Sequence, residues 1–485
     1  MTERVWHRAS AYPDISAVDI GLIELIDRRG EYYDFKLRQP TGRKFANDAG
    51  RLQAMQWPFR TLGASQTKAL IDMQLTSEDL AMRDGELGKA RQWAIRHQLQ
   101  VGRMFDAKDL VPVSQAHMMA DPESLGEAGV TFVEKFADLP QSDRQVAIPM
   151  ITDPRGVDLT YYDPLGQTEE MANLERRFIA ACRKLGIMMT DTCINYQTIM
   201  PPVFGDHVAY GDTGVVIYSN SVCGARSNFE GGPSALAAGL TGRTPRYGLH
   251  LDEKRRATRR FIVREQPEEL TAWGVLGAVI GRKSGSYWEV PVIEGIEHPP
   301  TSDEIKHMGA AMASYGSTPL FHIVGITPEC PRLGDVDGQN LTAEIVTHDD
   351  LVELRQPFGA KGEKVDVVVF AAPQLSLIEM QQVADLCRGR KISADTSLLV
   401  CTSPSVYADA KRMGINQAIE DFGGKVLQGT CFYQQYAREI GEANGWRRLL
   451  SNSVKIVNIL GGYGYAPALA SMEECVAAAE IGEVI

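Results

Sequence analysis

The sequence predicts an α/β protein with mostly parallel sheets covered by helices. Three observations predict this class. Short apolar runs typical of strands recur along the chain, amphipathic helical patterns separate them, and glycine or proline marks many of the connections. The alternation is clearest in the last third, where four strand-like runs lie between residues 365 and 460. A chain of 485 residues is long enough for about three domains.

The elements follow one another in a regular order. A first helix is expected from Ser77, which can cap it, and Leu80, Leu87 and Ala90 give that helix an apolar stripe. Strands are expected at residues 110–113, 146–151, 215–219, 320–326, 365–372, 398–402, 426–428 and 454–460. Helices are expected at residues 169–185, 233–240, 302–315, 377–387, 405–413 and 472–481.

The chain divides into three parts by composition. Residues 1–75 mix charges with little periodicity, and we interpret them as an N-terminal extension that packs on the body or on a partner. Residues 76–300 form a first α/β region that contains the most polar and glycine-rich block of the chain. Residues 301–485 form a C-terminal α/β region.

Composition and charge narrow the functional class. The formal net charge is −12, and an acidic surface repels phosphate groups, so we expect neither nucleic-acid nor anionic-membrane binding. No apolar run is long enough to span a bilayer, and the first residues lack a secretory signal, so a cytoplasmic location is expected. Eight cysteines are too few for a disulfide scaffold, and we expect free thiols.

The block of residues 218–253 is the strongest candidate for a binding site. It is expected to leave a strand, to turn through glycines, and to enter a helix at Pro233, a residue favoured in the first helical turn. Free backbone amides at such a turn bind anions, and Arg226 can grip a carboxylate or phosphate in a bidentate way. The alternative is a tight turn with solvated polar residues. The candidate binding residues are Asn220, Ser221, Arg226, Asn228, Glu230, Gly231 and Gly232.

Further candidates follow apolar runs elsewhere. Gln115 and His117 come after the first expected strand, and His117 is either an acid–base group or a structural anchor. Strand alternation would place His250 and Asp252 on one face, as a histidine–carboxylate pair or as part of a solvated edge. Four cysteines end or follow apolar runs, where α/β proteins usually place their sites: Cys193, Cys223, Cys401 and Cys431. They fit a metal or iron–sulfur site assembled by folding, although no CxxC pair identifies the metal.

From about residue 77 to the C-terminus, the chain resembles the large subunit or large domain of aconitase X, the dehydratase branch of the aconitase superfamily. The matching segments are VPVSQAH, NSVCGARSNFEGGPSALAAGLTGRTPRYGLHLDE, STPLFHIVGITPE, PQLSL, GGKVLQGTC and LSNSVK. The resemblance implies stacked α/β domains around a central cleft with an iron–sulfur cluster, and a hydro-lyase activity. Members of the family dehydrate cis-3-hydroxy-L-proline or mevalonate 5-phosphate.

Two departures from the family pattern bear on cofactor and partner. The resemblance implies that the large part is paired with a small swivelling domain, fused or separate. Nothing in this chain resembles that domain, so a separate small subunit is a possible partner. The family usually has cysteine at the positions of Asp191 and Ala372. The resemblance therefore leaves Cys193 and Cys431 as cluster ligands, with Cys223 or Cys401 as the third. Equally, the chain could hold no cluster, or a single metal ion with Asp191 as a ligand.

The implied reaction assigns roles to the candidates. Dehydration of a hydroxy acid needs removal of the α-proton, help for the departing hydroxide, and cations that hold the carboxylate. We expect His117, Ser234 and Lys455 as acid–base candidates, unless the base is a serine of the separate small subunit. The absence of an extra Lys/Arg cluster and a bacterial-looking central block favour cis-3-hydroxy-L-proline over mevalonate 5-phosphate. A dehydration–rehydration isomerase, or a relative without a cluster that is non-catalytic or independent of metal, would also fit the sequence.

Overall fold

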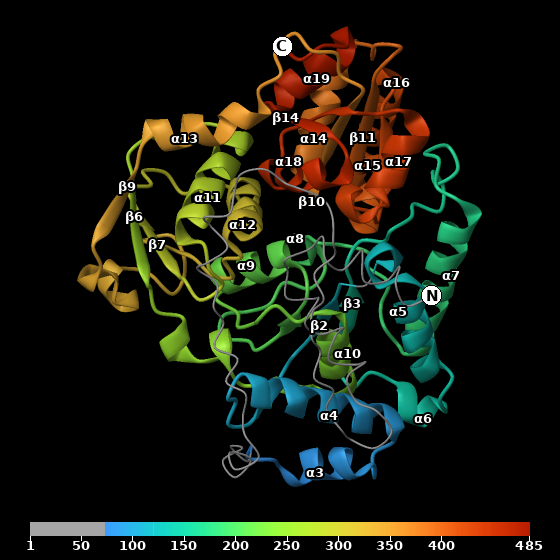
Figure 1. Cartoon of the computed structure of the whole chain (residues 1–485), viewed down its shortest axis with the longest axis vertical. Helices are drawn as coiled ribbons and strands as arrows, with labels where there is room; N and C mark the ends of the chain where they lie inside the picture. Colours follow the sequence, from blue (N-terminus) through green and yellow to red (C-terminus); the bar gives the residue numbers. More distant parts are fainter. Residues whose placement is uncertain (1–72, 120) are drawn as a thin grey trace, which may run out of the picture. The chain divides into compact units, whose positions relative to one another are not determined.

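Parallel strands organise the described part of the chain, which comprises residues 73–119 and 121–485 of the computed structural model. Almost all of the expected N-terminal extension therefore lies outside the described residues. Gln74–Ile485 form one unit with three parallel sheets and one short antiparallel pair, β1 (Leu110–Pro112) with β5 (Arg243–Pro245). The predicted α/β class with mostly parallel sheets is confirmed (Figure 1).

The first sheet has the strand order β3-β2-β4, and all its strands are parallel. They are β2 (Ala116–Met118), β3 (Met150–Thr152) and β4 (Ala209–Tyr210). The surrounding helices are α3 (Ser77–Asp84), α4 (Lys89–Met104), α5 (Pro122–Ala137), α6 (Gln141–Arg144), α7 (Glu169–Lys184), α8 (Asn195–Thr198), α9 (Thr213–Ser221) and α10 (Gly232–Thr241). Buried side chains of α4, α5, α7 and α10 share one apolar core with the strands.

The second sheet has the strand order β8-β7-β6-β9 and is also parallel. Its strands are β6 (Arg259–Val263), β7 (Pro291–Glu294), β8 (His322–Ile323) and β9 (Ala343–Val346). Its helices are α11 (Leu270–Ser284), α12 (Ser302–Gly316) and α13 (His348–Arg355). Side chains of α11 and α12 share an apolar core with this sheet. The boundary expected at residue 300 falls between β7 and β8, inside this sheet.

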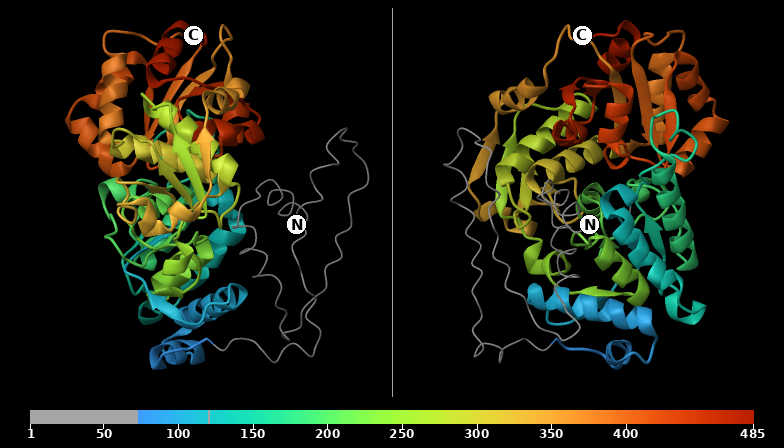
Figure 2. Two further views of the ribbon diagram at one scale, coloured as in Figure 1. Left: turned by 90° about the vertical axis from the view of Figure 1, so that its left-hand side faces the viewer. Right: turned by 45° about the vertical axis from the view of Figure 1, so that its right-hand side comes forward.

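The third sheet has the strand order β12-β11-β10-β13-β14, again parallel throughout. Its strands are β10 (Val367–Leu375), β11 (Ser397–Thr402), β12 (Lys425–Gln428), β13 (Arg448–Ser451) and β14 (Ala466–Leu469). Its helices are α14 (Leu377–Cys387), α15 (Pro404–Arg412), α16 (Ile415–Phe422), α17 (Ala437–Asn444), α18 (Val454–Leu460) and α19 (Met472–Ile481). Figure 2 shows these orange and red elements gathered at one end of the unit, with the blue helices α3 and α4 at the other.

Two expected strands are helices. Residues 215–219 belong to α9, and residues 454–460 form α18. Asp212 and Ser453 cap these helices by accepting hydrogen bonds from the backbone amides of Val215 and Ile456. Both helices are buried almost all round, so their sequences show no amphipathic period, and an apolar run of this length cannot be told from a buried strand.

Several local predictions are confirmed or corrected in detail. The helices expected at 377–387 and 472–481 have those bounds, and α10 carries Pro233 in its first turn. The first helix is capped by Thr76 rather than Ser77, through a reciprocal box with Asp79. The segment around His250 forms two short 3-10 turns instead of a strand, so the expected alternation of His250 with Asp252 does not occur.

The carboxyl ends of the first and third sheets meet. Arg155 comes three residues after β3. Its backbone amide donates to Gly429 O at 2.7 Å, just after β12, and its guanidinium donates to Gln428 O at 2.9 Å, at the last residue of β12. Since loops that leave the carboxyl ends of parallel strands usually form the site of an α/β protein, this junction is where polar groups from both sheets come together.

Candidate active site

Five buried polar residues gather at this junction, and we call them the acid–base cluster: His117, Asp153, Asp212, Gln434 and Lys455. His117 lies on β2, Asp153 directly follows β3, and Asp212 comes two residues after β4. Gln434 lies in a 3-10 turn after β12, and Lys455 lies in the first turn of α18, which follows β13. Each side chain is at most 6% exposed. The topology of two sheets thus brings together residues from positions as distant as 117 and 455.

His117 and Asp153 form one half of the cluster. His117 Nε2 lies 2.8 Å from the carbonyl oxygen of Thr192, to which it donates, and 3.4 Å from Asp153 Oδ1. Gln434 donates its side-chain amide to Asp153 Oδ2 at 2.7 Å. The Nδ1 atom of His117 has no hydrogen-bond partner among the described residues. With Nε2 as donor, Nδ1 carries the lone pair and is available as a proton acceptor.

Lys455 and Asp212 form the other half. Their side chains approach to 3.5 Å, and Lys455 Nζ lies equally far from the hydroxyl of Thr213. The ammonium group also lies 5.2 Å from the centre of the Tyr433 ring. These are loose contacts for a buried cation, because a strong charge-assisted hydrogen bond is nearer to about 2.8 Å. The ammonium therefore retains capacity to bind another anion.

Burial sets unusual protonation states here. Burial raises the pKa of Asp153 well above its ordinary value, and the neighbouring Asp212 and Cys193 raise it further. Burial lowers the pKa of His117, which favours the neutral imidazole. Burial also opposes the charged form of Lys455, but Asp212 and the nearby thiols outweigh it and raise the pKa. Burial thus favours a protonated carboxyl group and a neutral imidazole close to an ammonium ion.

The four candidate metal ligands are not brought together as a set. Cys193 and Cys431 are neighbours, and Cys431 contributes, after burial, to the raised pKa of the Cys193 thiol. Cys401 is buried within β11, and its thiol interacts with Thr430. Cys223 follows α9 and is only partly buried, near Tyr210 and Tyr218. The residues that the structure describes contain no group of three or more histidine, cysteine, aspartate or glutamate side chains placed to hold a metal ion.

Asp191 and Ala372 do not complete a ligand set. The Asp191 carboxylate accepts a hydrogen bond from the Thr152 hydroxyl at 3.0 Å and pairs with Arg155 at 3.2 Å. Ala372 offers only a methyl group, in a chain segment with positive φ. Cys193 and Cys431 are the neighbouring thiols at the junction, and the thiol of nearby Cys401 is hydrogen-bonded to Thr430. Since no group of three such side chains is placed to hold a metal ion in the described residues, a cluster held by three cysteines does not fit them.

Most predicted binding residues of the central block hold the block itself together. Asn220 donates to the carbonyl oxygens of Ser227 and Pro319, each at 2.9 Å. Asn228 Oδ1 accepts from the amide of Leu249 at 3.0 Å, and Ser221 Oγ accepts from the amide of Phe321 at 2.9 Å. Glu230 accepts from the hydroxyl of Thr244 at 2.8 Å. These contacts fix the loop that leads into α10.

The glycine turn at the start of α10 reaches the acid–base cluster. Gly231 is the N-cap of this helix, and Gly232 is its first residue. A Cβ atom on Gly232 would lie 3.0 Å from Met119 O, just past β2, and one on Gly211 would lie 2.8 Å from Glu230 O. The turn therefore lies at the carboxyl ends of β2 and β4, where Gly211 and Gly232 leave little room for a side chain.

Arg226 and His250 lie at the opposite end of the first sheet. Arg226 pairs with Asp252 at 2.5 Å and adjoins His207, which precedes β4. The Nδ1 atoms of His207 and His250 are 2.8 Å apart. All four residues line a hollow of about 310 Å³. Parallel strands run from this end towards the acid–base cluster, so these two predicted binding residues are separated from the cluster.

Ser234 and Gln115 also lie outside the cluster. Ser234 Oγ lies 3.0 Å from Nε2 of His97 on α4, so it joins two helices of the first core. Gln115 precedes β2, where its backbone carbonyl accepts from the amide of Ala209. Among the predicted catalytic residues, the structure therefore brings together His117 and Lys455.

Asp153, Asp212 and Gln434 are members of the cluster that the sequence did not predict. Asp153 has a usable signal, because it comes two residues after the apolar run at residues 146–151. Asp212 is hidden because the run after it is typical of a strand, whereas it is a helix that Asp212 caps. Gln434 has no distinctive sequence context.

Comparison with known proteins agrees with this architecture. Three models of aconitase X domains match the chain in succession: the first domain at residues 72–253, the second at 257–356 and the third at 365–481. The crystal structure of Thermococcus kodakaraensis aconitase X (holo-form) superposes with a TM-score of 0.76 at 30% identity, covering 84% of this chain and 100% of that one. Fold and site thus define a hydro-lyase of the aconitase superfamily.

Sequence relatives show the family. The phosphomevalonate dehydratase large subunit of Methanocaldococcus jannaschii is 32% identical over 392 residues, which cover 79% of this chain and 94% of that protein. The cis-3-hydroxy-L-proline dehydratase of Pseudomonas aeruginosa is 28% identical over 416 residues, covering 84% and 70% respectively. The chain belongs to the aconitase X family, as its sequence motifs predicted. Within residues 73–119 and 121–485, no helix has the length and apolar character that crossing a bilayer requires.

Proposed function

We propose that this chain is the large subunit of a dehydratase that removes water from cis-3-hydroxy-L-proline or a close analogue, together with a separate small subunit. The observation that carries the proposal is the acid–base cluster, in which a protonated Asp153, a neutral His117 and a loosely paired Lys455 meet at the junction of two sheets. The partner is inferred from relatives that are themselves large subunits.

The cluster supplies the elements that dehydration needs. Lys455 holds the substrate carboxylate, and its charge stabilises the enolate character that develops as the α-proton leaves. Asp153 gives its proton to the departing hydroxyl, since burial raises its pKa and favours the protonated form. His117 accepts a proton at Nδ1, the atom without a partner among the described residues. If the small subunit supplies the base instead, His117 positions Asp153.

The charge balance supports a zwitterionic substrate. Lys455 is matched by the single carboxylate of Asp212, so the cluster offers one cation for a substrate carboxylate and the Asp212 oxygens for a substrate ammonium group. Arg155, a second cation near this junction, already pairs with Asp191. A phosphate with nearly two negative charges would need further cations. This balance favours an imino or amino acid over a phosphorylated acid.

One observation supports mevalonate 5-phosphate as the second candidate substrate. The chain spans 94% and 92% of two phosphomevalonate dehydratase large subunits, but only 69% and 70% of two cis-3-hydroxy-L-proline dehydratases. The chain therefore matches nearly the whole of the former relatives and about two thirds of the latter. A small subunit could add the cations that the large subunit lacks.

The test is an assay of both substrates with the purified chain, alone and with any small aconitase X subunit that is encoded beside it. We expect dehydration of cis-3-hydroxy-L-proline only in the presence of the small subunit. If mevalonate 5-phosphate is dehydrated and cis-3-hydroxy-L-proline is not, mevalonate 5-phosphate is the substrate. No turnover of either substrate by the assembled pair would overturn the proposed function.

A further inference from the structure

The side chain of Gln374 has an unusual number of partners. It lies near the end of β10 and is fully buried. Its Oε1 accepts the backbone amide of Cys193 at 3.2 Å. Its Nε2 faces the carbonyl oxygens of Asp191 at 3.1 Å, Thr430 at 3.1 Å and Thr402 at 3.3 Å. One amide group therefore satisfies backbone atoms of three segments that are far apart in the sequence.

Those three segments are the ones that build the junction. The segment of Asp191 and Cys193 runs alongside β3, where the backbone amide of Thr192 donates to Thr152 O. Thr402 ends β11, and Thr430 follows β12. The backbone amide of Gln374 also donates to Cys193 Sγ at 3.4 Å. Gln374 thus lies between the segments that carry the two neighbouring thiols, Cys193 and Cys431, and connects the first sheet to the third.

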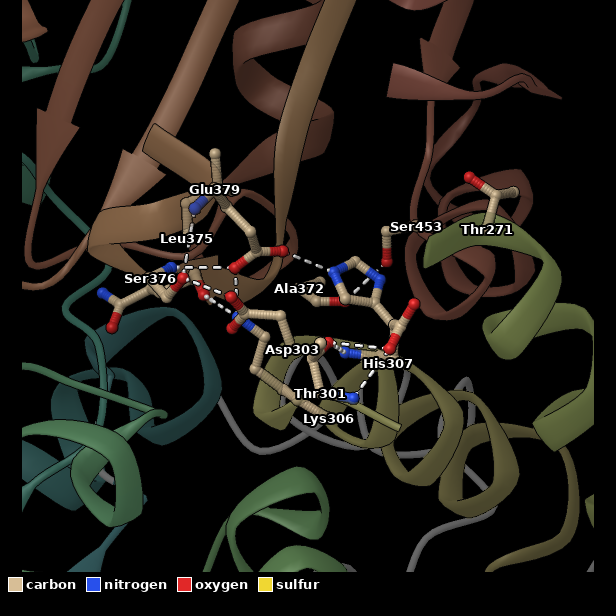
Figure 3. A network of polar contacts seen from close by, with 12 residues as sticks. Thr271, Thr301, Asp303, Lys306, His307, Ala372, Leu375, Ser376, Glu379 and Ser453 are labelled. Atoms are coloured by element: carbon tan, nitrogen blue, oxygen red, sulfur yellow. Dashed lines mark hydrogen bonds and ion pairs between the residues drawn. The ribbon is translucent and has the colours of Figure 1, made fainter. Parts of the chain in front are cut away.

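The charged network of Lys306, His307 and Glu379 (Figure 3) contacts the backbone of Gln374 through Lys306. Lys306 on α12 lies 3.4 Å from the carbonyl oxygen of Gln374 and forms an ion pair with Glu379 on α14. Glu379 also accepts from His307 at 2.7 Å and from the backbone amide of Ser376 at 2.8 Å. Lys306 and Glu379 are both fully buried. The second sheet's helix α12 thereby fixes the strand end that presents the amide.

This arrangement disagrees with the cofactor that the superfamily implies. A cluster held by three cysteines needs a third thiolate beside Cys193 and Cys431, and at the position where the resemblance to aconitase X implies a cysteine this chain has Ala372. Cys401 lies nearby, but its thiol is hydrogen-bonded to Thr430, and the described residues contain no group of three such side chains placed to hold a metal ion. The methyl group of Ala372 lies in one apolar cluster with Cys401 and Cys431. The space between the strand ends is spanned by the Gln374 amide, whose partners are backbone atoms.

We propose that the Gln374 amide joins the strand ends of the first and third sheets through its hydrogen bonds, and that the site is assembled in this way without an iron–sulfur cluster held by three cysteines. Gln374 is then a positioning residue: it contacts no reacting atom but fixes the segments of Cys193 and Thr430. The carbonyl of Thr192, between Asp191 and Cys193, receives the hydrogen bond of His117, so the amide also orients the acid–base cluster.

The first test is metal content, which does not depend on the proposed function. The chain is purified anaerobically, incubated with ferrous iron and sulfide, desalted, and analysed for iron and acid-labile sulfide. We expect far less than one iron atom per chain, with no difference among wild type, Cys193→Ser and Cys182→Ser. Stoichiometric iron and sulfide that disappear in Cys193→Ser and Cys431→Ser but remain in Cys182→Ser would overturn the proposal.

The second test replaces the amide by an apolar group of similar size. Gln374→Met leaves one buried amide and three carbonyl oxygens without their partner, and we expect Tm to fall by about 5 °C or more. Hydrogen exchange of the segment containing Cys193 should become about tenfold faster. The matched control is Gln435→Met, because the Gln435 side chain is also fully buried but its amide has no partner within the described residues.

The kinetic test rests on the proposed function and uses the assembled pair of subunits. Since small displacements of catalytic groups cost about 100-fold in rate, we expect kcat of Gln374→Met to fall by about that factor with KM changed less than about threefold. Gln435→Met should keep both constants. If Gln374→Met matches Gln435→Met in exchange and in Tm, Gln374 does not bridge the strand ends, whatever the enzyme's substrate.

Discussion

The two ends of the first sheet contain similar residues in different electrostatic states. At the carboxyl ends of β2, β3 and β4, the acid–base cluster is buried, and Lys455 lies 3.5 Å from its nearest carboxylate. At the amino ends, a hollow of about 310 Å³ is lined by His207, His250, Arg226 and Arg246. There Arg226 pairs with Asp252 at 2.5 Å, and Arg246 donates to Asp109 at 2.6 Å.

The difference shows why a hollow with charged walls does not by itself identify the catalytic centre. At the amino ends each of these two guanidinium groups already has a carboxylate in close contact, so both charges are compensated within the protein. At the carboxyl ends, burial raises the pKa of Asp153 and so favours its protonated form, and Lys455 lies 3.5 Å from its nearest carboxylate. Groups whose protonation is shifted by burial and by neighbours are those suited to proton transfer.

The largest expected effect comes from removing the loosely paired cation. Lys455→Met should lower kcat/KM by about 1,000-fold, because the developing enolate loses its buried charge partner. The comparison variant is Arg246→Met at the amino ends, which should change kcat/KM less than about threefold. Both are measured with the assembled subunits. Equal losses in the two variants would place the reacting substrate across both ends of the sheet.

The next effect is a change in the pH profile. Asp153→Asn should lower kcat by about 100-fold, the usual contribution of a general acid. In the wild type, kcat should fall as pH rises past the raised pKa of Asp153, because the proton donor is lost. In Asp153→Asn this alkaline limb should be absent. A limb that persists unchanged in the variant would assign the acid to another residue.

The fold could be predicted from the sequence far better than the site. Amphipathic helices such as α14 and α19 are predicted with their bounds, because one face is buried and the other is solvated. The helices α9 and α18 are not, because burial on all sides removes that periodicity. Asp212 caps α9, and Lys455 lies in the first turn of α18. Because neither helix can be predicted, the pairing of these two residues cannot be predicted either.

The site depends on distances that local patterns do not contain. His117 and Lys455 are separate candidates in the sequence, and their proximity follows only from the meeting of two sheets at Arg155. Within the central block, polar residues are predicted to bind a ligand, although Asn220 and Asn228 satisfy backbone groups of the protein itself. Composition cannot distinguish residues that bind a ligand from residues that satisfy the backbone, because both roles need side-chain amide groups.

A smaller effect tests whether burial sets the protonation states of side chains near the carboxyl ends of the first sheet. Glu175 on α7 accepts the amide of Gly156 at 3.0 Å, and burial raises its pKa to about 8. A raised pKa contributes stability below the unfolded value near 4.5, and that contribution is lost as pH rises through about 8. We expect the free energy of unfolding of the wild type to fall by a few kcal/mol between these values relative to Glu175→Gln.

The measurement for Glu175 is denaturant unfolding at several pH values. The control is Glu170→Gln, an exposed position on the same helix, which should reproduce the wild-type pH dependence. Parallel curves for wild type and Glu175→Gln would mean that Glu175 is ionised in the folded protein, and that burial shifts protonation at these ends less than we infer.

The smallest effect concerns Ser234, which the sequence predicts as an acid–base group and the structure places against His97. Ser234→Ala should change kcat about twofold, because its hydroxyl faces α4 and not the acid–base cluster. Burial lowers the pKa of His97 to about 4, so the folded state loses stability as pH falls from 6.5 through 4. Because Ser234→Ala also lacks the hydrogen bond to His97, the variant should unfold at a higher pH within that range. A large loss of kcat at unchanged stability would instead return Ser234 to the catalytic centre and extend that centre along α10.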